Sequence, residues 1–204
     1  MTRPDKDGAS RGGRTNGDSP DNARRDDPPR DDVHRNGPPP DDASRDDGTG
    51  FDARPLQELG GWSLARVAAL AADSHAGQVD KAGRPYIEHP VRVARLLADR
   101  GEPPLRQALG LLHDTVEDTD LTLERLLVLG LPERVVAGVD ALTKRPEEPR
   151  EDYYARVRVN ADALPVKLAD IDDNAGPQRL GLLDRATRQR LSTRYAHARQ
   201  VLGG

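Results

Sequence analysis

Hydrophobic residues are concentrated in the last 150 or so positions of this chain. The segment 1–54 consists mainly of Asp, Arg, Pro, Gly, Ser and Asn. A segment with so little to bury cannot offset the entropy lost on ordering. The sequence therefore predicts a disordered, low-complexity tail over 1–54 and one folded domain over 55–204. The hydrophobic residues of the tail are Met1, Ala9, Ala23, Val33, Ala43, Phe51 and Ala53.

From Trp62 onward, hydrophobic residues recur every three or four positions, which is typical of amphipathic helices. No stretch alternates hydrophobic and polar residues between turn signals, so we expect no sheet. The predicted fold class is all-α. We expect Pro90 in the first turn of a helix, with His89 extended just before it, because proline biases the preceding residue away from the helical region. Three expected helices begin near Leu64, Pro90 and Leu105. Further helices are expected over Leu123–Leu129, Glu133–Leu142, Glu151–Asn160, Leu164–Asp173 and Asp184–Leu202.

Composition excludes several classes of function. The chain has no cysteine, which excludes a disulfide scaffold, a thiolate nucleophile and a sulfur-ligated zinc site. A net charge of −4 and 3% aromatic residues give no case for nucleic-acid binding. No hydrophobic run is long enough to cross a bilayer, and polar residues follow Arg24 and Arg25 where an export signal would need hydrophobic ones. We therefore expect a cytoplasmic protein with a small-molecule partner, without nucleic acid or membrane.

The strongest local feature is a cluster of one imidazole and three carboxylates, His113, Asp114, Glu117 and Asp118, directly after a Leu-rich run. On one continuous helix, residues three and four apart share a face. Three adjacent carboxylates repel one another and require a cation or a raised pKa. The alternative is an exposed acidic helix end. Acidic residues favour helix N-termini, however, and this cluster follows a hydrophobic run. We therefore favour a metal or catalytic site, whose nitrogen and oxygen ligands suit Mn²⁺, Fe²⁺ or Zn²⁺.

Two other segments end in residues that could complete this site. His89 lies before Pro90, although a single histidine there is more often an N-cap or packing residue. Asp170 follows the hydrophobic helix pattern of 164–169 and lies four residues before Asn174, on the same helical face. The alternative for Asp170 is an ordinary amphipathic helix with a solvated polar side.

The order and spacing of three segments, Tyr86–Pro90, Leu112–Thr119 and Val166–Asp170, resemble the HD-domain hydrolases of the RelA/SpoT type. The resemblance covers about Leu64 to Leu202. Small single-domain members of that family remove the 3′-pyrophosphate from guanosine tetra- and pentaphosphate. The resemblance thus implies an HD-domain helical bundle and a hydrolase that uses metal-activated water to cleave a phosphate ester, with a phosphorylated nucleotide as its substrate.

The resemblance also implies a role for individual residues, with Mn²⁺ or another divalent cation as the cofactor. Lys144, Arg145 and Lys167 are further candidates for phosphate contacts, although such residues are more often surface charges. The implied site consists of the metal ligands His89, His113, Asp114 and Asp170, the water-activating residues Glu117 and Asp118, and the substrate-binding residues Lys81 and Asn174.

The chain departs from the family pattern at positions that would contact substrate. Asp80 replaces the first residue of a basic pair, and an acidic residue there would repel a polyphosphorylated ligand. The family's Leu-His-Asn-Met-Arg-Thr run is replaced here by 172–177, Asp-Asp-Asn-Ala-Gly-Pro, in which Gly176 takes the place of the arginine. Two alternatives therefore stay open: hydrolysis of another nucleotide or phosphate ester, and a non-catalytic scaffold that binds a nucleotide or a protein.

Overall fold

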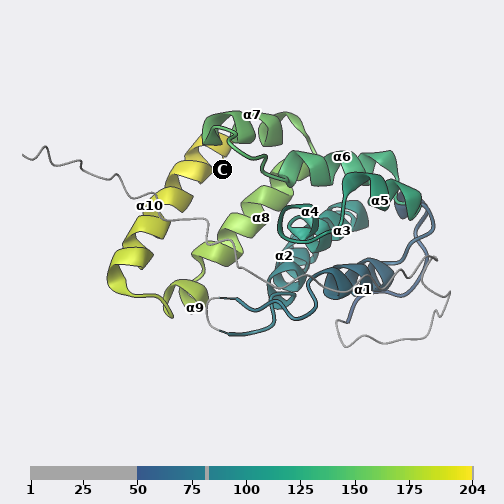
Figure 1. Cartoon of the computed structure of the whole chain (residues 1–204), viewed down its shortest axis with the longest axis horizontal. Helices are drawn as coiled ribbons and strands as arrows, with labels where there is room; N and C mark the ends of the chain where they lie inside the picture. The colour runs from purple at the N-terminus through teal and green to yellow at the C-terminus, as the bar shows by residue number, and fades with distance from the viewer. Residues whose placement is uncertain (1–49, 81–82, 204) are drawn as a thin grey trace, which may run out of the picture. The chain divides into compact units, whose positions relative to one another are not determined.

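The computed structural model describes residues 50–80 and 83–203, which form helices and loops (Figure 1). Within these ranges no strand occurs, and the only extended pairing is an isolated bridge between Val79 and Pro85. The prediction of an all-α fold is confirmed. Lys81 and most of the predicted tail lie outside the described residues.

The longer helices begin and end within a few residues of their predicted positions, because each has a hydrophobic face with clear helical periodicity. The short elements Gln57–Leu59 and Pro177–Leu180 were not predicted, since a single turn is too short to display a period. The elements in chain order are η1 (Gln57–Leu59, a 3₁₀ turn), α1 (Leu64–Ser74), α2 (Glu88–Asp99), α3 (Pro104–Leu112), α4 (Thr115–Asp118), α5 (Leu123–Val128), α6 (Glu133–Leu142), α7 (Arg150–Val159), α8 (Ala163–Ala175), α9 (Pro177–Leu180) and α10 (Arg185–Leu202).

The start of α2 differs from the sequence prediction. His89 lies in the first turn of the helix, whereas the sequence predicted an extended conformation before it. The chain coils already before the proline, because the backbone N–H of His89 donates to the carbonyl of Tyr86 at 2.9 Å. Pro90 lacks an N–H, but the first N–H groups of a helix have no helical acceptor, so none is lost. The expectation of an extended His89 was therefore wrong.

The acidic cluster does not lie on one continuous helix, contrary to the sequence interpretation. Helix α3 ends at Leu112, and α4 begins at Thr115 after a bend at His113 and Asp114. The Thr115 hydroxyl donates to the carbonyl of Leu112 at 2.7 Å, which provides a partner for a carbonyl group at the end of α3. Because of this bend, the four side chains of the cluster are directed by two short helical segments rather than by one helical face.

Helix α8 contacts α2, α3, α6, α7 and α10 and thus lies between the two ends of the bundle (Figure 1). Its buried residues Val166, Ala169 and Ile171 belong to one hydrophobic core with α1, α2, α3 and α6. Phe51, within the segment predicted as a tail, packs against the same core. This central position brings residues from early and late in the sequence next to α8.

Helices α2 and α3 pack closely because α3 has a glycine where they meet. A Cβ atom on Gly110 would lie 2.9 Å from Leu97 Cδ1 and 3.1 Å from Ala94 Cα. Such distances are too short for van der Waals contact, so only glycine allows this approach. The contact fixes the separation of His89 at the start of α2 from His113 at the end of α3.

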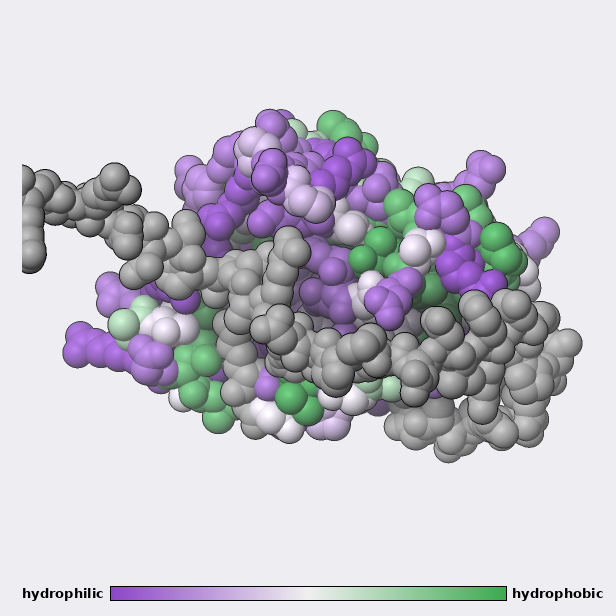
Figure 2. Space-filling model, viewed as in Figure 1, coloured by the Kyte–Doolittle hydropathy of each residue, from purple (hydrophilic) through white to green (hydrophobic). Residues whose placement is uncertain are grey.

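Hydrophilic residues cover most of α7, which ends at the exposed Val159, whereas hydrophobic residues are exposed among polar ones over α5 (Figure 2). The exposed hydrophobic residues of α5 include Leu127 and Val128. Among the described residues, no helix combines the length and the hydrophobicity needed to cross a membrane.

Candidate metal and hydrolytic site

Four of the predicted site residues meet where α2, α3 and α8 come together. His89, His113 and Asp114 each offer one ligand atom, and these atoms lie within 4.8 Å of one another. Asp170 joins them from α8, with its Oδ1 atom 3.1 Å from His89 Nε2 and 3.7 Å from His113 Nε2. The structure therefore brings together all four residues that the sequence indicated as metal ligands.

The hydrogen bonds of the two histidines determine which ring nitrogen faces the centre of this group. His113 Nδ1 lies 2.9 Å from the carbonyl oxygen of Gly110, which can only accept, so Nδ1 is the protonated nitrogen. His89 Nδ1 lies 2.7 Å from the carboxylate of Asp173 and is protonated for the same reason. In each neutral ring Nε2 then carries a lone pair, which is the form that binds a metal.

Both Nε2 atoms face carboxylate oxygens. His113 Nε2 is buried without a hydrogen-bond partner and lies 3.1 Å from Asp114 Oδ2. Such a group of acceptors is repulsive unless a proton or a cation lies among them. Burial opposes charge on His113, but Asp114 and Asp170 raise its pKa well above the ordinary value. Two imidazoles and two carboxylates fit a divalent cation such as Mn²⁺.

Asp170 also contacts two residues of its own helix. Lys167 Nζ pairs with Asp170 Oδ2 at 2.7 Å, and the amide of Asn174 donates to Oδ1 at 2.5 Å. These contacts hold the carboxylate with Oδ1 toward the histidines. Asn174, predicted to bind substrate, therefore lies beside a candidate ligand and also borders the adjacent pocket.

Glu117 and Asp118 point in different directions. Glu117 accepts a hydrogen bond from the backbone N–H of Lys144 at 2.9 Å and borders the pocket. Asp118 instead accepts a hydrogen bond from the hydroxyl of Tyr86 at 3.2 Å, and the same hydroxyl lies 2.7 Å from Asp114 Oδ2. Burial raises the pKa of both carboxyl groups, and the charge of Asp114 raises it further. A raised pKa makes either carboxylate a better proton acceptor, but only Glu117 also borders the pocket.

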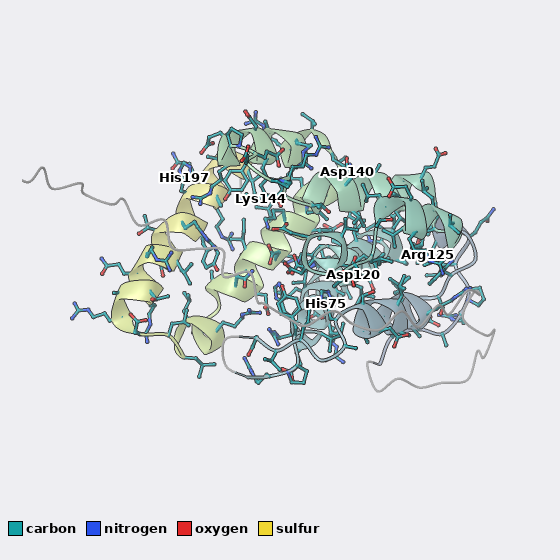
Figure 3. All side chains as sticks on the ribbon, viewed as in Figure 1. His75, Asp120, Arg125, Asp140, Lys144 and His197 are labelled. Carbon is teal, nitrogen blue, oxygen red and sulfur yellow. The ribbon has the colours of Figure 1, made fainter. Side chains whose placement is uncertain are left out.

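A pocket of about 250 Å³ opens beside Glu117 and Asp170, between α7, α8 and α10. Lys144 contributes from the segment that joins α6 to α7 (Figure 3). Lys167, a candidate phosphate contact, is 20% exposed and lies in this pocket, whereas Arg145 is not among its lining residues and pairs with Asp140. The residues that line the pocket are Glu117, Lys144, Arg150, Tyr153, Tyr154, Lys167, Asp170, Ile171, Asn174, Arg194, Tyr195 and Ala198.

Several of these residues had no signal in the sequence. Arg150 and Arg194 are ordinary charges on amphipathic helices, and only the packing of α7 and α10 against α8 brings them to the site. Asp173 was not distinguished from Asp172, and Tyr86 was read only as part of a motif. Asp80 accepts a hydrogen bond at 3.0 Å from the backbone N–H of Arg84, so this acidic residue closes the turn of its own loop.

No family model matches the chain. The chain is 44% identical over 117 residues to a probable guanosine-3′,5′-bis(diphosphate) 3′-pyrophosphohydrolase of Synechocystis sp.. It is 40% identical over 115 residues to guanosine-3′,5′-bis(diphosphate) 3′-pyrophosphohydrolase MESH1 of Danio rerio. Each alignment covers 52% of this chain, and the chain spans 15% of the first protein and 64% of the second, less than two thirds of either.

A solved structure described as a metazoan ortholog of SpoT that hydrolyses ppGpp superimposes with a TM-score of 0.58. The match covers 69% of this chain and 85% of that chain at 24% identity, and it shows a shared fold. The resemblance to RelA/SpoT-type HD-domain hydrolases is confirmed. Another relative, 48% identical over 63 residues, is a GTP pyrophosphokinase of Streptomyces coelicolor, matched over 31% of this chain and 7% of its own length. The names of the relatives therefore include two different reactions, hydrolysis and pyrophosphoryl transfer.

Proposed function

We propose that this chain is a divalent-metal-dependent hydrolase that removes the 3′-pyrophosphate from guanosine 3′-diphosphates. The observation that carries the proposal is the convergence of His89, His113, Asp114 and Asp170 beside Glu117, at the edge of a pocket lined with positive charge. The curated names of two relatives support the same reaction. The proposal keeps Mn²⁺ as the cation, a phosphorylated nucleotide as the partner and the cytoplasm as the location, as predicted from the sequence.

The metal would be held by the Nε2 atoms of His89 and His113 and by the carboxylates of Asp114 and Asp170. When bound, a divalent cation supplies Lewis acidity, which lowers the pKa of water and neutralises charge on phosphoryl oxygens. The protein residues orient this chemistry. Asn174 and Lys167 fix the direction of the Asp170 carboxylate, and the Tyr86 hydroxyl fixes that of Asp114.

Glu117 is positioned to accept a proton from the attacking water. Its carboxylate is oriented by the N–H of Lys144 and borders the pocket, and its raised pKa suits a general base. The water oxygen forms a new bond to the phosphorus atom that is attached to the ribose 3′-oxygen. The bond between this phosphorus atom and the 3′-oxygen breaks. The 3′-oxygen leaves with the bonding electrons and takes up a proton, so one water is consumed and pyrophosphate is released. The sequence resemblance assigns water activation to Asp118 as well, and this carboxylate accepts a hydrogen bond from the Tyr86 hydroxyl.

The pocket suits a ligand with several phosphate groups. Its lining includes four cationic side chains, Lys144, Arg150, Lys167 and Arg194, against two carboxylates. Arginine is well suited to phosphate, because its planar guanidinium donates two parallel hydrogen bonds. One observation favours a second candidate, another nucleotide as substrate: the loop position that is basic in the family is Asp80 here, and this carboxylate is engaged with Arg84.

The test is a substrate panel with the full chain and Mn²⁺: guanosine tetraphosphate, other nucleotides and simple phosphomonoesters. We expect pyrophosphate release from guanosine tetraphosphate, with a kcat at least about a hundredfold lower in Asp114→Ala. Faster turnover of another nucleotide would favour the second candidate. Absence of turnover of every panel member, with metal bound, would favour a non-catalytic scaffold and contradict the proposal.

A further inference from the structure

Asp173 is a buried carboxylate that the hydrolytic scheme above does not use. Its side chain is 8% exposed, and its Oδ2 atom lies 2.7 Å from His89 Nδ1. Arg92 donates to Oδ1 at 2.7 Å and to Oδ2 at 3.1 Å, and Arg179 donates to Oδ2 at 3.1 Å. One carboxylate thus connects α2, α8 and α9 behind a candidate metal ligand.

We propose that Asp173 is a positioning residue, which fixes the tautomer of His89 and strengthens its Nε2 atom as a metal ligand. This inference rests on the proposed metal site. It concerns a residue of this chain that the sequence resemblance does not supply, since Asp173 occupies the place of the histidine in the family's Leu-His-Asn-Met-Arg-Thr run.

The surroundings keep Asp173 ionised, as this role requires. The guanidinium groups of Arg92 and Arg179 both donate to this carboxylate, and their positive charges favour its ionised form. An ionised carboxylate can only accept, so the imidazole must donate from Nδ1 and present the lone pair of Nε2. A negative partner also withdraws the proton partially from Nδ1, which raises the electron density at Nε2.

The second histidine provides an internal comparison. His113 Nδ1 donates to the backbone carbonyl of Gly110, a neutral acceptor that no side-chain substitution can remove. His89 is therefore the imidazole of the pair whose basicity depends on a replaceable charge. Its Nε2 atom faces Asp170 Oδ1 at 3.1 Å. In the other tautomer of His89, Nε2 would carry a proton, and an N–H group would lie where the cation is expected.

Asp172 offers a matched control on the same helix. It is also a partly buried carboxylate, with a side chain 19% exposed, and it pairs with two arginines, Arg100 and Arg199. No described contact joins it to either histidine. Replacing Asp172 removes the same charge from the neighbouring position without touching His89.

The experiment measures Mn²⁺ affinity of the full-length chain by electron paramagnetic resonance, without any substrate. We expect Asp173→Ala to weaken Mn²⁺ binding by about 10- to 100-fold, and Asp172→Asn to leave it within about twofold of wild type. Asp173→Asn keeps an acceptor for Nδ1–H without the charge and should lose roughly threefold to tenfold. If Asp173→Ala does not fold, the nearly isosteric Asp173→Asn decides the question.

A second readout separates positioning from a merely structural role. In ¹⁵N spectra of the metal-free protein at alkaline pH, wild-type His89 should be protonated at Nδ1, and Asp173→Ala should show a mixture of the two tautomers. Unchanged Mn²⁺ affinity in folded Asp173 variants, or an equal loss in Asp172→Asn, would overturn the inference. A wild-type chain that binds Mn²⁺ but hydrolyses nothing would contradict the proposed activity and leave this result standing.

Discussion

The Nε2 atom of His89 lies 3.1 Å from Oδ1 of Asp170, which connects the first turn of α2 to the middle of α8. Because His89 Nδ1 donates to Asp173, both facing atoms are acceptors, and their separation suits a shared proton or cation. Asp114 Oδ2 lies 3.7 Å from the same nitrogen. This arrangement of acceptors supports the proposed cation site more directly than the acidic cluster did in the sequence.

Glu117 and Asp118 are expected to differ in importance. Glu117→Gln should lower kcat by about 10²- to 10⁴-fold, because it removes the proton acceptor that borders the pocket. Asp118→Asn should lower kcat by about tenfold, since Asp118 is turned toward Tyr86. Steady-state kinetics at saturating Mn²⁺ would measure both. A larger loss in Asp118→Asn than in Glu117→Gln would contradict the assignment of Glu117 as the base.

Arg194 tests whether the pocket binds the substrate's phosphates. It lies on α10 among the residues that line the pocket and is not one of the candidate ligands. Arg194→Leu should raise KM about tenfold with little change in kcat, because it removes ground-state and transition-state binding alike. Arg190→Leu, on the same helix but not among the lining residues, serves as the control. Equal KM values in wild type and Arg194→Leu would exclude this pocket as the phosphate site.

Gly110 should tolerate no side chain. In Gly110→Ala the added Cβ would press on Ala94 and Leu97 and push α2 away from α3. We expect a loss of about 1 to 3 kcal/mol in the free energy of unfolding, even though alanine gains about 1 kcal/mol in helix propensity. Urea denaturation would measure it. Stability equal to or above wild type would show that the two helices do not need this close contact.

Asp162 gives a pH-dependent test of stability away from the metal site. Hydrogen bonds from Arg134 at 2.7 Å and Arg106 at 3.3 Å lower the pKa of the Asp162 carboxyl group. A lowered folded-state pKa means that the ionised carboxylate stabilises the fold at pH values above its ordinary pKa of 3.8. This contribution is lost as the pH falls through the lower, folded-state value.

The variant Asp162→Asn should therefore be less stable than wild type by about 1 kcal/mol at pH 7, a value reduced for the partial exposure of the pair. The two proteins should converge in denaturant melts as the pH falls below about 4. A stability difference that stays constant from pH 7 down to pH 3 would mean that the charge of Asp162 is not the cause.

The sequence predicted most of the fold because periodicity is a local property. Helix α6 has its predicted bounds, Glu133–Leu142, since its hydrophobic face is complete and Pro132 precedes it. Two local predictions failed, both at the ends of helices. The turn at Tyr86 starts α2 before Pro90, and the bend at His113 divides the acidic cluster between α3 and α4.

The candidate site was predictable only in part. His113 and Asp114 carried a local signal, whereas His89 and Asp170 became convincing only through the order of three segments that resemble one family. Neither source indicates a role for Asp173, because it is one of two adjacent acidic residues on one helix and only packing decides that Asp173 faces His89 and Asp172 faces Arg199. The sequence did not predict a role for the pocket's arginines either, since their role depends on how α7 and α10 pack against α8.

The most direct test of the account is a titration of Mn²⁺ into the chelator-treated, full-length chain, with binding and hydrolysis of guanosine tetraphosphate followed in parallel. We expect one Mn²⁺ per chain, half-saturation of binding and activity at the same metal concentration, and loss of both in His113→Ala. Full hydrolysis without a divalent cation, or Mn²⁺ binding unchanged in a folded His113→Ala variant, would contradict the claim that these residues form a hydrolytic metal site.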